Sequence, residues 1–201
     1  MRDLASVLLV CVPLLGAASS AAAAPDPGVS VVGVGPRDVL NLRAQPDARS
    51  ALVGSLPHNA RDLVVVAQAT ETLDWVMVQK GRMRGWANAR FLAYGDPLQQ
   101  HRLPLRLHCA GTEPFWGIEV GYGRADAHLA FDDRHQRLAL ETPMPAAARP
   151  TLWLLPGRGP RDAATFLLLE RRVCSDGMSD ARYAFSVAAR LGDVLLSGCC
   201  R

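Results

Sequence analysis

The stretch ARYAFSVAARLGDVLLSGCC (residues 181–200) carries much of the information about the fold. Tyr183, Phe185 and Val187 alternate with small or polar residues, which is the period-two pattern of a half-buried β-strand. A Leu-Gly-Asp turn at residues 191–193 follows, and another apolar run comes directly after it. The stretch therefore predicts an antiparallel β-hairpin.

This hairpin ends in two adjacent cysteines, Cys199 and Cys200, whose side chains point to opposite faces of an extended strand. The two cysteines should therefore reach different partners. Cys109 and Cys174 are the other cysteines after residue 24, so we expect one of the pair to bridge Cys174 and the other to bridge Cys109. One bridge with two free thiols is the alternative. A bridge from Cys174 closes a loop of ~25 residues, which the chain-entropy model values at about 3 kcal/mol.

The beginning of the chain has the layout of a secretory signal peptide. An early arginine precedes an apolar run (Leu4–Leu15), and small residues with Ala-x-Ala sites follow. We expect residues 1–24 to be a signal peptide, cleaved after Ala23 or Ala24. The apolar run is shorter than the ~20 residues that a membrane span needs. The mature chain is therefore expected to be periplasmic or secreted, without a membrane span, and its even cysteine count fits disulfide bonds there.

Short apolar segments separated by polar turns fill the rest of the chain, without a long helical period. We predict an all-β protein with a small barrel at residues 25–95 and a second, disulfide-stapled antiparallel β domain at residues 105–201. A linker rich in proline and polar residues, 96–104, divides them. The charge is nearly balanced, with 22 Lys and Arg against 19 Asp and Glu. No long run of one sign occurs, so no nucleic-acid partner is expected.

The first unit carries two separated motifs, LNLRAQP beginning at Leu40 and GWANARFL beginning at Gly85. Together they resemble a bacterial SH3 domain, in which a Leu-Asn-x-Arg strand leads into a Pro-containing turn and a Gly-Trp pair precedes an aromatic-Leu pair. The resemblance covers about a third of the chain. It implies an SH3-like barrel that binds peptidoglycan or an envelope protein. Trp75 and Trp86 would be either barrel core or part of a partly exposed aromatic groove.

The second unit carries GTEPFW (111–116), CSDGMSDARY (174–183) and LSGC (196–199) in that order. These motifs resemble an uncharacterised family of bacterial envelope domains, whose members combine Gly-Thr-Glu-Pro-Phe-Trp, Cys-x-Asp-Gly-Met-Ser-Asp and a terminal Leu-x-Gly-Cys. The resemblance spans about half of the chain. Such domains are often joined to other small secreted β domains, including META and lysozyme-inhibitor types. The resemblance implies an envelope location but no reaction.

Residues of these motifs are the candidate recognition residues of the second unit: Glu113, Phe115, Trp116, Asp176, Ser179 and Asp180. For Phe115 and Trp116, burial in the core is the alternative. For CSDGMSD, the alternative is a structural turn centred on Asp176 and Gly177, whose polar side chains bond nearby backbone amides. Glu113 with either aspartate could form a general acid/base pair, but no recognised hydrolase motif accompanies them.

These observations favour an exported binding protein over an enzyme. The SH3-like barrel would bind the cell wall or an envelope protein, and the second domain would be a recognition module, for instance an inhibitor of wall-degrading enzymes. The alternative function is that of a wall-targeted hydrolase with an unrecognised active site in the second domain.

No cofactor or metal site is expected. His128 and His135 could face each other across a hairpin that turns near Asp132 and Asp133, but a solvent-exposed hairpin explains these residues equally well. The CSDGMSD segment lacks the ligand spacing and the distal glutamate of an EF-hand calcium loop.

Overall fold

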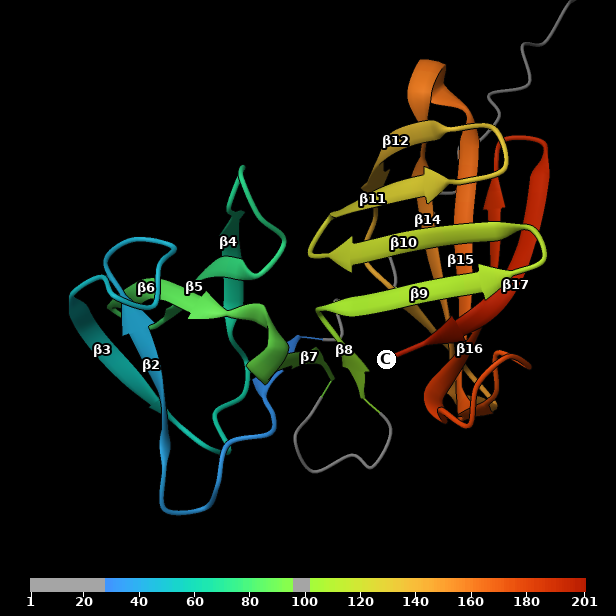
Figure 1. The fold of residues 1–201 in the computed structure, drawn as a ribbon. Coiled ribbons are helices and arrows are strands. Elements are labelled where there is room, and N and C mark those ends of the chain that lie inside the picture. Colours follow the sequence, from blue (N-terminus) through green and yellow to red (C-terminus); the bar gives the residue numbers. More distant parts are fainter. Residues whose placement is uncertain (1–27, 96–101) are drawn as a thin grey trace, which may run out of the picture.

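The computed structural model describes residues 28–95 and 102–201, and these consist mainly of β-strands (Figure 1). In this part of the chain the only helical segments are two short 3₁₀ turns, η1 (Ala89–Phe91) and η2 (Pro160–Asp162). The all-β prediction is confirmed. The predicted signal peptide and most of the predicted linker lie outside the described residues.

Two small sheets form the N-terminal unit. One has five strands in the order β3–β2–β6–β5–β4, and the other has the order β1–β7–β8. Alternating apolar side chains of β5 and β6, such as Val76, Val78 and Ala87, are buried between them and the neighbouring strands. The strands of this unit are β1 (Val29–Val31), β2 (Val39–Arg43), β3 (Leu52–Pro57), β4 (Val64–Gln68), β5 (Trp75–Lys80), β6 (Met83–Asn88), β7 (Leu92–Tyr94) and β8 (Leu103–Pro104).

The C-terminal unit is an antiparallel barrel of eight strands. Strands that follow one another along the chain pair as hairpins, and the pairings of β17 with β9 and of β12 with β14 close the barrel. The short strand β13 pairs with β14 beside this closure. The strands are β9 (Leu107–Thr112), β10 (Phe115–Gly121), β11 (Arg124–Leu129), β12 (Arg134–Leu140), β13 (Met144–Ala146), β14 (Arg149–Arg158), β15 (Ala164–Cys174), β16 (Tyr183–Leu191) and β17 (Val194–Cys200).

Every second side chain of these strands points into the barrel, as the alternation in the sequence predicts. Ile118, Leu129, Leu138 and Leu167 are fully buried there. The predicted hairpin of residues 181–200 is present as β16 and β17, joined by a tight turn in which Gly192 has a φ of 65°. Positive φ values of this kind are readily adopted by glycine, which has no Cβ.

Two glycines of the predicted signature motifs make room for Trp116 inside the barrel. A Cβ added to Gly111 would lie 2.2 Å from Trp116 Nε1, and one added to Gly198 would lie 2.8 Å from Trp116 Cζ2. The Gly198 Cβ would also lie 2.1 Å from the carbonyl oxygen of Ala110. The indole therefore packs directly on the backbone of β9 and β17, which requires glycine at both positions.

Both predicted disulfide partners are found, on opposite faces of β17. Cys200 lies directly across from Cys109 on β9 and bonds to it inside the barrel, where both residues are fully buried. Cys199 points outward and bonds to Cys174 at the end of β15. The alternative of one bridge with two free thiols is therefore wrong.

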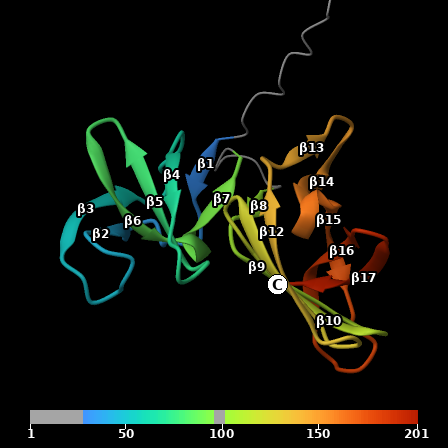
Figure 2. The same cartoon turned by 90° about the horizontal axis from the view of Figure 1, so that it is seen from above.

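The two units lie side by side, with β1, β7 and β8 between them in the view from above (Figure 2). Leu103 and Pro104, which the sequence assigns to the linker, form β8 and pair with Tyr94 and Ala93 of β7. One continuous cluster of buried apolar residues extends from the first unit through β7, β8 and Leu105 into the barrel. Within the described residues, no helix has the length and apolar character that crossing a bilayer requires.

Candidate functional site

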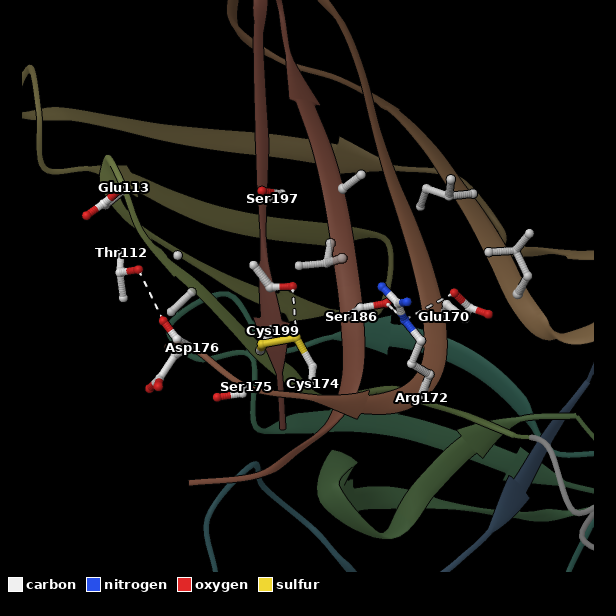
Figure 3. Close-up of a pocket in the computed structure, with 17 residues that line it drawn as sticks. Thr112, Glu113, Glu170, Arg172, Cys174, Ser175, Asp176, Ser186, Ser197 and Cys199 are labelled. Carbon is white, nitrogen blue, oxygen red and sulfur yellow. Dashed lines mark hydrogen bonds and ion pairs between the residues drawn. A yellow bond between two sulfur atoms is a disulfide. The ribbon is translucent and has the colours of Figure 1, made fainter. Parts of the chain in front are cut away.

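A groove of about 540 Å³ lies on the outer face of the barrel, across the strands β9, β17, β16 and β15 (Figure 3). The groove is lined largely by small outward residues and glycines, and Leu152 and Leu168 add apolar surface to it. The floor residues are Ala110, Gly111, Ser186, Ala188, Ser197 and Gly198.

The CSDGMSD segment forms one wall of this groove. The Cys174–Cys199 disulfide joins the beginning of the segment to β17, and Cys174, Ser175 and Asp176 line the groove. Thr112 donates a hydrogen bond from Oγ1 to the carbonyl oxygen of Asp176 at 3.3 Å. The GTEPFW and CSDGMSD motifs, about 60 residues apart in sequence, are therefore in direct contact.

The carboxylate of Asp176 is bonded within its own loop. Its Oδ1 accepts hydrogen bonds from the backbone N–H of Met178 at 3.0 Å and of Ser179 at 2.9 Å. Its Oδ2 accepts hydrogen bonds from the hydroxyls of Ser179 at 2.9 Å and of Tyr183 at 3.0 Å. The Ser179 hydroxyl in turn accepts the N–H of Ala181. This is the structural turn centred on Asp176 and Gly177 that the sequence offers as the alternative to a recognition segment.

These hydrogen bonds stabilise the ionised carboxylate of Asp176. The backbone amides of Met178 and Ser179, followed by the hydroxyls of Ser179 and Tyr183, lower the pKa of Asp176 to about 2. A carboxylate of this kind is ionised at neutral pH and its oxygens are already occupied, so it is poorly suited to donate or accept a proton in catalysis.

Glu113 also lines the groove, at the tight turn between β9 and β10. Its side chain is exposed and forms no hydrogen bond or ion pair with the described residues. Asp180 is exposed as well, but it does not line the groove. The geometry thus places Glu113 and Asp176 in one groove and leaves Asp180 outside it, so these three carboxylates do not converge on one point.

The two aromatic residues of GTEPFW point in opposite directions from β10. Phe115 is 57% exposed, whereas Trp116 is 5% exposed and lies inside the barrel. Trp116 is therefore a core residue, which was the alternative for it, and only Phe115 can contact a partner. Phe115 lies at the rim of the turn beside Glu113 and does not line the groove.

A charged cluster at one end of the groove was not recognised in the sequence. Glu170 forms ion pairs with Arg149 at 2.6 Å and with Arg172 at 3.4 Å, and Arg172 also donates a hydrogen bond to the Ser186 hydroxyl at 3.1 Å. The alternation in β15 could have placed Glu170 on the outer face. Its association with Arg149 of β14 depends on the strand register.

A second groove, of about 330 Å³, lies on the N-terminal unit. Trp75 and Phe91 are partly exposed and line it together with the polar residues Asn41, Arg43 and Arg90. The Arg90 guanidinium lies over the Phe91 ring, 4.4 Å from its centre. Trp86 is also partly exposed, but it does not line this groove. Neither tryptophan is therefore fully buried core.

The chain matches no family model, and neither a curated protein nor a solved structure is significantly similar to it. The resemblances to a bacterial SH3 domain and to the envelope domain family therefore stay predictions. The fold and the two disulfides rest on the structure alone. Disulfides of this kind fit an oxidising compartment outside the cytoplasm.

Proposed function

We propose that this chain is an exported binding protein whose recognition surface in the second unit is the outer groove of the barrel. The observation that carries the proposal is the groove itself, an open depression at which the two signature motifs meet. Its walls are held by a disulfide and by the closed Asp176 loop, so the surface is pre-shaped for a partner. Pre-organisation of this kind reduces the entropy cost of binding.

The chemistry of the groove favours recognition over catalysis. It exposes short side chains and backbone together with Leu152 and Leu168, and its ends carry Glu113 on one side and the Glu170–Arg172 pair on the other. A polypeptide segment or a sugar chain with polar groups at both ends fits such a surface. The alternative hydrolase has less support, because the bonded carboxylate of Asp176 provides no proton-transfer partner for Glu113.

We further propose that the groove of the N-terminal unit binds peptidoglycan. The partly exposed ring of Trp75 offers a face on which a sugar can stack, and Arg43 and Arg90 offer donors for the carboxylates of wall peptides. This proposal agrees with the resemblance to bacterial SH3 domains, and an envelope protein remains the alternative partner.

Sedimentation with purified peptidoglycan tests the wall-binding proposal. We expect the mature chain to sediment with the wall material, and we expect Trp75→Ala to weaken this binding by roughly tenfold or more, as truncation of an aromatic anchor does. Trp86→Ala is the matched control, because Trp86 is also partly exposed but lies outside the groove. A mature chain that stays entirely in the supernatant would contradict wall binding.

Substitutions that fill the barrel groove with a long side chain test whether the groove is the recognition surface. Ser197→Arg places a long side chain on the groove floor, and Leu195→Arg places the same side chain on the outer face of β17 outside the groove. We expect Ser197→Arg to abolish the binding of partners that the wild-type chain recovers from an envelope extract, and Leu195→Arg to retain it. Equal binding by all three proteins would show that the groove is not the recognition surface.

A further inference from the structure

The barrel includes the β11–β12 hairpin (Figure 1). Two exposed histidines, His128 and His135, come together on this hairpin. His128 lies directly across from His135 in the strand register. Their imidazole rings stack with centres 4.1 Å apart and an angle of 11° between the ring planes. Both residues are exposed, so their ring nitrogens are open to solvent.

The turn of the same hairpin adds a carboxylate to this pair. Asp133 adopts a φ of 52°, and this left-handed conformation turns the chain so that Asp133 Oδ1 lies 3.8 Å from His128 Nε2. One ligand atom from each of His128, Asp133 and His135 lies within 4.8 Å of the other two. Three donors of the nitrogen and oxygen type therefore converge at the tip of one hairpin.

The surroundings leave these donors available. Two arginines of β12 are engaged in ion pairs of their own, because Arg134 pairs with Asp132 and Arg137 pairs with Asp126 at 3.3 Å. On the other side of His128, the neighbour across β10 is Gly117. A Cβ added to Gly117 would have only the carbonyl oxygen of Cys109 within 4 Å, at 3.9 Å, so the space directly beside this position is open.

We propose that His128, Asp133 and His135 bind a divalent transition-metal ion, with Zn²⁺, Ni²⁺ and Cu²⁺ as the chemical class. Imidazole nitrogen with one carboxylate oxygen is a donor set that suits these ions. Metal–nitrogen bonds are ~2.0–2.1 Å long, so the donors must come closer together. Rotation of exposed side chains achieves this, and Asp133 is 94% exposed. Three protein ligands leave further coordination positions open to water or to a donor from another molecule.

From the sequence alone, we expected an ordinary exposed hairpin without a metal ion. The difference comes from the register. A shift of one residue in the pairing of β11 with β12 would place His128 and His135 on opposite faces, whereas the observed register places them in one stacked pair.

Titration calorimetry of the mature chain with Zn²⁺ alone tests the site. We expect one ion per chain, and we expect His128→Ala and His135→Ala each to weaken binding by at least about tenfold, the loss typical when even an outer partner of a metal ligand is removed. Asp133→Asn should cause a smaller loss. The controls are His58→Ala in the N-terminal unit and Asp193→Asn in the β16–β17 turn, and both should bind Zn²⁺ as the wild type does.

Paramagnetic broadening by Cu²⁺ in NMR spectra locates the ion independently. The imidazole signals of His128 and His135 should broaden first, and Cu²⁺ should bind more tightly than Zn²⁺. Circular dichroism of each variant shows that the fold is retained, as expected for exposed positions. Zn²⁺ binding that persists in the double variant His128→Ala/His135→Ala, or broadening confined to other histidines, would overturn the proposal.

Discussion

The carboxylate of Asp176 organises the CSDGMSD loop. It accepts hydrogen bonds from the amides of Met178 and Ser179 and from the hydroxyl of Tyr183. Because Asp176 also lines the barrel groove, these bonds hold one wall of the groove in place.

The loop should open in acid. The pKa of Asp176 is about 2 in the folded chain, below its ordinary value of 3.8, so the fold favours the ionised form. The stabilisation is complete above pH 3.8 and is lost as the pH falls through about 2. Hydrogen exchange of the Met178 and Ser179 amides should accelerate in this window relative to the barrel strands, and a carboxyl NMR titration should give the pKa directly.

Two variants test whether the Asp176 carboxylate is what holds the loop closed. Asp176→Ala should leave these amides exchanging fast at every pH. Asp180→Ala is the matched control, because Asp180 belongs to the same loop but forms no hydrogen bond or ion pair with the described residues. Identical exchange in the two variants would show that the carboxylate of Asp176 does not hold the loop.

Gly198 should not tolerate even a methyl group. In Gly198→Ala the new Cβ would lie 2.1 Å from the backbone oxygen of Ala110 and 2.8 Å from the Trp116 ring. Because backbone cannot move aside as a flexible side chain can, the free energy of unfolding should fall by about 1–3 kcal/mol. Denaturant unfolding measures the change. In Gly117→Ala the nearest atom is 3.9 Å away, so this control should unfold like the wild type, and equal losses would contradict the packing argument.

At the scale of the elements, β17 is linked to more than one other strand of the barrel by both strand pairing and disulfide bonds. It pairs with β16 and β9, and its two terminal cysteines anchor it to the interior of β9 and to the exterior end of β15. The two bridges close loops of very different length, with sequence separations of 91 and 25 residues. The longer loop is worth about 1 kcal/mol more in the chain-entropy model.

Mild reduction of the folded protein should break the two disulfides in order. Cys109 and Cys200 are completely buried in the barrel, whereas Cys174 is partly exposed at the groove. A reducing thiol therefore reaches the Cys174–Cys199 bridge first. Alkylation followed by mass spectrometry should find Cys174 and Cys199 modified while the other pair stays bonded. Simultaneous modification of all four cysteines would show that reduction requires global unfolding.

The positions of the strands can be predicted from the sequence more readily than the strands with which they pair. Alternation predicted the hairpins at residues 181–200 and around Asp132 and Asp133, because the period of two is a local property of each strand. The irregularity in β15 between Arg171 and Cys174, where the register with β16 shifts, was not predicted. Such a shift is a property of the pairing between two strands, which the alternation within one strand does not specify.

At the scale of the whole molecule, the two units are joined by specific contacts as well as by the chain. Gln68 of the first unit accepts a hydrogen bond from the backbone N–H of Tyr122 in the barrel, and its amide donates to the carbonyl oxygens of Thr72 and Trp75. Arg106 pairs with Asp74 at 3.0 Å. Both grooves therefore lie on one connected body.

The junction predicts cooperative unfolding. We expect calorimetry of the wild-type chain to show a single transition. Gln68→Ala should lower the stability by about 1–3 kcal/mol, because it leaves the Tyr122 amide and two carbonyl groups without this partner, and it should begin to separate the transitions of the two units. Gln79→Ala is the control, since the Gln79 side chain is exposed and donates its hydrogen bond to Gly81 within the β5–β6 hairpin. Two transitions in the wild type would contradict this coupling.

The sequence by itself determined the local properties of this protein. Alternating apolar residues specify the strands, glycine and aspartate specify the turns, and adjacent cysteines on an extended strand require partners on opposite faces. Only the tertiary structure decided that Cys200 bonds Cys109 and Cys199 bonds Cys174, that β12 and β14 close the barrel, and that Asp176 turns toward its own backbone. These outcomes depend on register and closure between segments far apart in the chain. The alternation of a single strand carries no information about the strand that will lie beside it.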